Sequence, residues 1–113
     1  MNIQIFGTKK SSDARKAERW FKERRIRFQY IDLTQKEISK GELRSVAQAV
    51  GGLRALVDPA AKDAYAVALI EHTPDAMLLD KLLENQQVLR QPIVRNGRAA
   101  TVGYAPEVWK TWE

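Results

Sequence analysis

The first 31 residues of this chain have the pattern strand, helix, strand, and that order restricts the folds open to it. Residues 2–6 are mainly apolar and indicate a buried strand, whereas residues 26–31 alternate and indicate a strand with one wet face. Between them, apolar side chains recur at helical spacing, at Ala14, Ala17, Trp20 and Phe21. Because two strands joined by a helix form a right-handed crossover, we expect them to lie parallel in one sheet.

The middle of the chain, at about residues 34–87, is predicted to be helical. Residues 39–42 have the pattern of a capping box, and Gly51-Gly52 marks the end of the helix that follows. Pro59 is suited to the first position of a second helix. Thr73 is suited to cap a third helix that has Pro74 at its first position. The expected buried faces consist of Leu43, Val46, Ala47 and Val50 in the first helix and Met77, Leu78, Leu79, Leu82 and Leu83 in the third.

The end of the chain is predicted to return to the sheet. Residues 92–95 and 100–102 indicate two strands, and Asn96-Gly97 between them suits the tight turn of a hairpin. Arg98 and Ala99 are candidates for a bulge. Residues 106–113 indicate a last helix.

Joined in order, these elements predict an α/β fold. We expect a single domain, residues 1–113, with a four-stranded mixed sheet and helices on both of its faces. Its two ends, at about residues 1–33 and 88–113, have the βαβ and ββα order of the thioredoxin-like arrangement, and the helical block at about 34–87 is an insert.

Composition excludes several classes of function. The chain has no cysteine, and therefore neither a disulfide nor thiolate chemistry, and its apolar runs are too short to span a bilayer. It has no pattern of a secretory signal, no metal-ligand spacing among its acidic residues and no glycine-rich phosphate loop. We therefore expect a cytoplasmic protein that uses no cofactor, metal or membrane.

The net charge of +5 comes largely from the segment between Lys9 and Arg27. Such an excess fits a surface for nucleic acid, an anion or an acidic partner. It also fits the solvated face of one helix, which we favour because long charged side chains normally coat exposed helix faces. We accordingly expect no direct binding of nucleic acid.

Ser11 occupies the most informative position in the chain, in the turn between the first strand and the first helix, beside Lys9 and Lys10. The unpaired N–H groups of a helix N-terminus and two ammonium groups stabilise an anion, so a cysteine here would be a reactive thiolate. A serine hydroxyl has no comparably acidic proton and needs an adjacent base to become a nucleophile. The sole histidine, His72, lies in the insert. We therefore interpret Ser11 as a helix cap, with catalysis as the alternative.

The same turn is a candidate anion site. Lys9, Lys10 and the backbone N–H groups around Ser12 can together hold a phosphate or a sulfate. The alternative is that both lysines are solvated loop residues. A small oxyanion and a protein partner are thus the two candidate ligands.

Three stretches of the sequence resemble the arsenate reductase (ArsC)/Spx family of thioredoxin-like proteins. Residues 6–17 are similar to the family's first strand, turn and helix, in which an aromatic residue, a glycine, a cysteine and a basic helix follow in order. Residues 89–94 are similar to its basic-basic-Pro segment, and residues 102–109 to the turn that leads into its last helix. With a helical insert between them, these stretches extend the resemblance over nearly the whole chain.

The resemblance implies a reductase in which a cysteine attacks an oxyanion such as arsenate, with glutathione or a thioredoxin-like protein completing the cycle. In the Spx branch it implies a redox-sensing regulator that binds RNA polymerase, and a third branch has no settled substrate. It also implies that Pro92 is cis, which would bring Arg90 to the anion site.

The sequence departs from the reductase pattern at four positions. Ser11 stands where the cysteine is expected, and Gln91, Asp58 and Tyr104 stand where basic residues are expected. A carboxylate in an oxyanion pocket costs on the order of several kcal/mol unless it is paired or turned away. We therefore expect a pseudoenzyme, a binding or regulatory protein without catalysis. The alternatives are an arsenate reductase-like oxidoreductase whose cysteine was replaced by Ser11, with glutathione or a thioredoxin-like protein as partner, and an Spx-like regulator that binds RNA polymerase.

Overall fold

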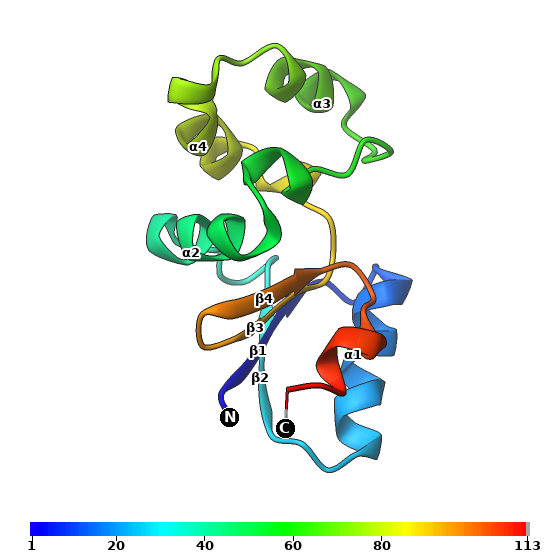
Figure 1. Cartoon of the computed structure of the whole chain (residues 1–113). Coiled ribbons are helices and arrows are strands. Elements are labelled where there is room, and N and C mark those ends of the chain that lie inside the picture. Colours follow the sequence, from blue (N-terminus) through cyan, green and yellow to red (C-terminus); the bar gives the residue numbers. More distant parts are fainter. Residues whose placement is uncertain (113) are drawn as a thin grey trace.

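The computed structural model describes residues 1–112. In chain order, its elements are β1 (Ile3–Gly7), α1 (Ser12–Glu23), β2 (Phe28–Asp32), α2 (Lys40–Val50), a 3-10 helix η1 (Leu53–Leu56), α3 (Ala64–Glu71), α4 (Asp75–Glu84), a 3-10 helix η2 (Gln86–Val88), β3 (Ile93–Asn96), β4 (Ala99–Val102) and α5 (Pro106–Trp109) (Figure 1). Within residues 1–112, every helix is too short or too polar to cross a membrane.

The four strands form one mixed sheet in the order β2-β1-β3-β4. β1 is parallel to β2, with Ile5 opposite Tyr30, and antiparallel to β3, with Ile5 opposite Val94. β3 and β4 pair as an antiparallel hairpin. The predicted four-stranded mixed sheet, with a parallel pair from the first strands and a hairpin from the last, is therefore confirmed.

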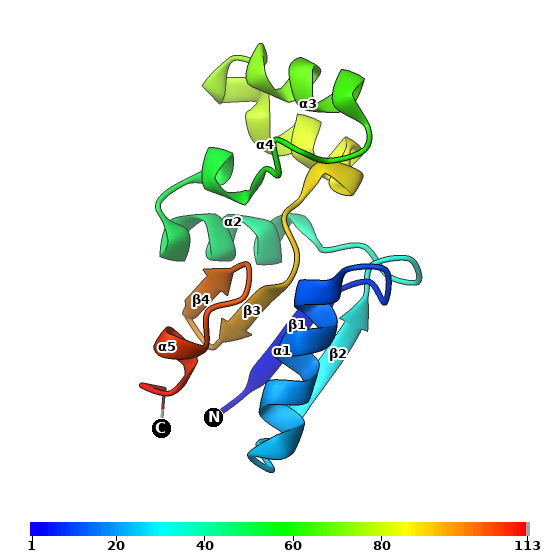
Figure 2. The ribbon, with the colours of Figure 1, turned by 90° about the vertical axis from the view of Figure 1, so that its right-hand side faces the viewer.

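Alternate side chains of the strands contribute to two separate apolar cores. Ile3 and Ile5 belong to a core that includes Phe21 of α1 and Trp109 of α5. Phe6, on the opposite face of β1, belongs to a core shared with α2, α3 and α4. Helices thus cover both faces, as predicted, and Figures 1 and 2 show α3 and α4 stacked beyond α2 at one end of the sheet.

The ends of α1 and α2 follow the predicted signals. Ser11 caps α1, because its Oγ accepts a hydrogen bond from the N–H of Ala14 at 3.1 Å. Ser39 and Glu42 form the predicted capping box, in which each side chain bonds the backbone N–H of the other. Gly51, with φ +98°, ends α2 in the left-handed conformation that glycine adopts readily.

The start of α3 differs from the prediction. Pro59 does not begin a helix, because Oδ1 of Asp58 accepts a hydrogen bond from the N–H of Ala60 at 2.9 Å and folds this segment into a turn. α3 begins only at Ala64, and Asp63 caps it. The aspartates on either side of the turn, rather than the proline within it, thus set the local structure.

Thr73 does not cap α4 as predicted. Its hydroxyl donates to the carbonyl oxygen of Leu69 at 2.6 Å, so it closes the end of α3 instead. Pro74 precedes the first residue of α4, Asp75, and is not the first helical residue itself. The prediction of a helix start at this point is right to within one residue.

The hairpin turn lies one residue later than predicted. Asn96 is the last residue of β3 and pairs with Ala99, so Gly97 and Arg98 form the two-residue loop and the predicted bulge does not form. Gly97 has φ +61°, and a positive φ at the first central position is what a type II′ turn requires.

The last helix is shorter than predicted. α5 ends at Trp109, and the following N–H groups of Thr111 and Trp112 donate to the residue three positions before each, at 2.9 and 3.1 Å. Bonds of that spacing form tight turns rather than a further α-helical turn. Glu113, the end of the predicted helix, lies outside the described residues.

Candidate functional site

A cleft of about 780 Å³ lies at the N-terminal end of α1, between the sheet and the insert. Four segments line it: the turn between β1 and α1, the loop after β2, residues 58–63 before α3, and residues 86–91 before β3. It is therefore built by parts of the two segments that resemble the family, residues 6–17 and 89–94, together with loops from the start, middle and end of the insert.

Ser11 lies at this cleft, at the start of α1. Its N–H donates to the carbonyl oxygen of Thr8 at 3.1 Å, and its Oγ accepts from Ala14 as described above. The hydroxyl oxygen is thus engaged as a cap, with its side chain half-buried at the cleft wall. The predicted position of Ser11 at a helix N-terminus is confirmed.

Gln91 joins the turn before α1 to the segment before β3. Its Oε1 accepts hydrogen bonds from the N–H of Thr8 at 2.7 Å and from the Thr8 hydroxyl at 3.1 Å. The peptide bond between Gln91 and Pro92 is cis, and Pro92 is buried. The residue that stands where the family pattern has a base therefore serves as a hydrogen-bond acceptor for the turn.

Gly7 lets α1 approach the sheet closely at this point. A Cβ on Gly7 would lie 2.8 Å from the Cβ of Ala14 and 3.2 Å from the hydroxyl oxygen of Tyr30. Burial raises the pKa of the Tyr30 hydroxyl, with Glu18 and Asp32 adding smaller effects in the same direction. Sequence reasoning missed the importance of Gly7, because its constraint comes from two residues on other elements.

The structure brings some of the candidate anion-binding residues together and separates others. Lys10 and Ser12 line the cleft with Ser11. Lys9 is exposed and lies outside the lining, and its carbonyl oxygen accepts a hydrogen bond from the Arg15 guanidinium. Arg90 also lies outside the lining: its N–H donates to Leu56 at 2.8 Å, and its guanidinium Nη2 would lie 3.5 Å from a Cβ on Gly103.

The charges at the cleft are of both signs. Three acidic residues and two lysines line it: Glu37, Asp58, Asp63, Lys10 and Lys62. Asp58, where the family pattern has an arginine, is half-buried at this wall. A cleft with more carboxylates than ammonium groups is poorly suited to concentrate a bare oxyanion.

Two carboxylates near the cleft have fixed hydrogen-bond partners. Asp63 accepts from the N–H of Ala66 and from the side chain of Gln87, each at 3.0 Å, and these bonds hold the pKa of its carboxyl below its usual value. Asp32 accepts from the hydroxyl and the N–H of Thr34, which lower the pKa of that carboxyl in the same way. Both carboxylates are thus held ionised and oriented by the loops that carry them.

His72 is remote from Ser11. It follows α3, is exposed, and its Nδ1 lies 2.8 Å from the carbonyl oxygen of Ala68. It does not line the cleft, so it offers Ser11 no base. Within residues 1–112, no group of His, Asp or Glu side chains is placed to hold a metal ion.

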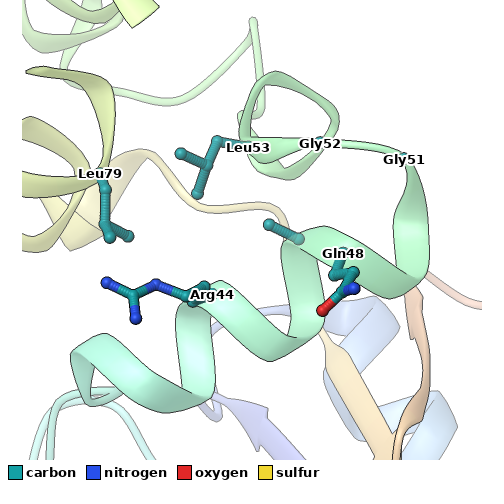
Figure 3. A pocket seen from close by; sticks show the side chains of 7 residues that line it. Arg44, Gln48, Gly51, Gly52, Leu53 and Leu79 are labelled. Carbon is teal, nitrogen blue, oxygen red and sulfur yellow. The ribbon is translucent and has the colours of Figure 1, made fainter. Parts of the chain in front are cut away.

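A second hollow, of about 450 Å³, lies on the insert between α2, η1 and α4 (Figure 3). Gly51, Gly52, Leu53 and Leu79 give it an apolar lining, and Figure 3 shows Arg44 and Gln48 on the α2 side. It shares no residue with the cleft at Ser11 and contains no cluster of titratable groups. The feature of the sequence that indicates this hollow is the glycine pair Gly51-Gly52, which has no side chains to fill the space beside the end of α2.

Comparison with known proteins agrees with this architecture. The family model for the ArsC family matches residues 6–112. An ArsC family related protein from Bacteroides fragilis has a similar structure, with a TM-score of 0.85, 18% identity, and coverage of 100% of this chain and 98% of that chain. The arsenate reductase from Vibrio cholerae superposes with a TM-score of 0.80 at 23% identity, over 96% of this chain and 94% of its own.

No curated protein matches the chain significantly. The family match nevertheless spans almost all of the sequence, and the structural likeness independently supports the thioredoxin-like fold with a helical insert. These similarities leave one fact of the sequence unchanged, which is that this chain contains no cysteine. The chain belongs to the ArsC family.

Proposed function

We propose that this protein is a non-catalytic member of the ArsC family that binds its ligand at the Ser11 cleft without turning it over. The observation that carries the proposal is that Ser11 and Asp58 line the same cleft. The first replaces the thiol that the family resemblance leads us to expect, and the second places a carboxylate where that resemblance leads us to expect an arginine. Relative to what the resemblance leads us to expect, both the nucleophile and the residue that would hold an anion are thus replaced.

The contacts of Ser11 support a non-catalytic role, because within residues 1–112 neither an imidazole nor one of the cleft carboxylates accepts a hydrogen bond from its hydroxyl. Its Oγ accepts a hydrogen bond from the N–H of Ala14. The sole histidine lies on the insert and does not line the cleft. A hydroxyl without a neighbouring base remains a weak nucleophile. The role that remains for this position is to shape the turn and cap α1.

The charges of the lining favour a ligand that has both positive and negative groups, such as a segment of a protein partner. They disfavour a small oxyanion, which has negative charge alone. Lys10 and the start of α1 attract a negative group, whereas Asp58 and Asp63 attract a positive one. A ligand with only negative charge would meet both attraction and repulsion in the same cleft.

Titration with inorganic phosphate, followed by backbone amide NMR shifts, tests this account of the cleft. We expect the natural protein to bind phosphate weakly, with shifts centred on residues 7–13. Asp58→Asn should bind phosphate at least about threefold more tightly, because a repelling carboxylate is removed. Glu107→Gln, which removes an exposed negative charge outside the lining, is the matched control and should leave phosphate affinity unchanged. Phosphate shifts elsewhere in the chain, or no gain in Asp58→Asn, would contradict the proposal.

A further inference from the structure

The end of α1 remote from the cleft carries a shallow, open basic groove of about 510 Å³, formed by Lys22, Arg25, Ile26, Arg27 and Phe28. Its three cationic side chains are exposed, and its two apolar side chains are half-buried. Figure 2 shows this part of the chain at the lower end of α1, where it leads into β2. The groove therefore combines positive charge with apolar surface.

Local acids neutralise only part of this groove. Residues 22–31 contain four basic residues and one acidic residue, Glu23. Lys22 pairs with Glu18 at 3.9 Å. In the part of the chain that the structure describes, neither Arg25 nor Arg27 makes an ion pair. These two guanidinium groups are therefore available to an anionic partner.

Arg25 has a backbone conformation that favours glycine, with φ +57°. Its N–H donates to Lys22 at 3.0 Å, and the N–H of Ile26 donates to Phe21 at 3.0 Å, the two bonds of a Schellman motif at the end of α1. Glycine is common at this position because a Cβ is strained there. A role for the charge of Arg25 would explain why an arginine occupies a strained position.

The groove lies beside an open edge of the sheet. β2 is the last strand on its side, and Leu33 donates its N–H to Gly7 of β1 at 3.0 Å. Backbone groups alternate in direction along a strand, so those of Phe28 and Tyr30 point away from β1, toward the outer edge. An extended peptide can add to such an edge through main-chain hydrogen bonds.

We propose that this edge binds an extended acidic segment of a protein partner, which pairs with β2 as an added strand and places carboxylates beside Arg25 and Arg27. The fork of a guanidinium group matches a carboxylate. Main-chain pairing provides affinity, and the charges provide selectivity. This surface is distinct from the Ser11 cleft, so the inference does not depend on the function proposed for the cleft. A nucleic acid would meet the same cations but has no main chain to pair with β2.

Fluorescence anisotropy with a labelled peptide of alternating Glu and Val tests the proposal at low ionic strength. We expect the protein to bind this peptide and not the corresponding peptide of alternating Lys and Val. Arg25→Glu/Arg27→Glu should weaken binding by about tenfold or more, because two attractive pairs become repulsive. Arg44→Glu/Arg98→Glu makes the same change of net charge at exposed positions on α2 and the hairpin turn, and should leave affinity within about twofold.

Two further arms separate charge from backbone pairing. Arg25→Gly should raise the midpoint of thermal unfolding while lowering affinity, a combination that a merely structural role for Arg25 would not produce. A peptide in which Pro-Pro replaces a central Glu-Val pair should bind more weakly than one with Gln-Ala there, because one of two adjacent prolines must face β2 and proline cannot donate to it. Equal binding of the Lys peptide, equal losses in both double variants, tolerance of proline, or tighter binding of single-stranded DNA than of the Glu peptide would each overturn the proposal.

Discussion

The side-chain oxygen of Gln91 accepts two hydrogen bonds from Thr8, one from its N–H at 2.7 Å and one from its hydroxyl at 3.1 Å. The two residues are 83 positions apart in the chain. This contact fastens the turn that carries Ser11 to the segment that enters β3. The shape of the candidate site thus depends on a residue that is itself a departure from the family pattern.

Gln91→Leu should lower the free energy of unfolding by about 1–3 kcal/mol, because it leaves the part-buried N–H of Thr8 without an acceptor. Urea unfolding followed by tryptophan fluorescence measures the change. Gln48→Leu, at an exposed position on α2, is the control and should cost less than about 0.5 kcal/mol. Similar losses in the two variants would show that the contact with Thr8 contributes little.

Gly7→Ala should destabilise the protein by about 1–3 kcal/mol, since the added Cβ meets the Cβ of Ala14 at 2.8 Å and both residues are buried. Gly41→Ala offers a matched control on α2, where the added methyl group meets nothing within 4 Å. It should be neutral or stabilise the protein by up to about 1 kcal/mol, because alanine has the higher helix propensity. The midpoint of thermal unfolding should therefore fall in Gly7→Ala and should stay level or rise in Gly41→Ala.

Thr101→Val should cost about 1–3 kcal/mol. The hydroxyl of Thr101 accepts a hydrogen bond from the indole N–H of Trp109 at 2.7 Å, and valine would leave this buried donor unpaired. Thr101→Ser keeps the hydroxyl and should be milder, losing only the packing of a methyl group. If serine were as damaging as valine in urea unfolding, packing rather than the hydrogen bond would hold α5 to the sheet.

Asp63 should make a pH-dependent contribution to stability. Hydrogen bonds from Ala66 and Gln87 lower the pKa of its carboxyl in the folded protein. Its contribution is therefore present above the pKa of the unfolded chain and is lost as the pH falls through the lower pKa of the folded state. The stability difference between the natural protein and Asp63→Ala should be largest near neutral pH and shrink toward about pH 3. A difference that grows as the solution is acidified would contradict this assignment.

Local signals in the sequence predict much of the fold. The cap at Ser11, the capping box at Ser39 and the glycine stop at Gly51 each act within a few residues, and each is found as expected. Pro59 shows the limit of such signals. A proline fits a helix start and a turn equally well, and the bond from Ala60 to the neighbouring Asp58 favours the turn.

The candidate site is less predictable, because its contacts join distant parts of the chain. The sequence places Ser11 beside Lys10, but no periodicity shows that residues 58–63 and 86–91 form the opposite walls of the cleft. Likewise, the side chain of Arg90 lies near Gly103 instead of in the cleft, although its neighbour Gln91 lines the cleft. Tertiary packing decides which of two adjacent side chains reaches the site.

Arsenate reduction by Ser11→Cys shows whether the missing thiol is the only barrier to catalysis in the Ser11 cleft. It is measured with both a glutathione-linked and a thioredoxin-linked assay, beside the natural protein and Ser11→Cys/Asp58→Arg. We expect no turnover by the natural protein or by Ser11→Cys, because restoring a thiol leaves Asp58 in the cleft and Gln91 before Pro92. Any gain should require the double variant. Sustained reduction by the natural protein, or robust reduction by Ser11→Cys alone, would show that the cleft is still built for catalysis.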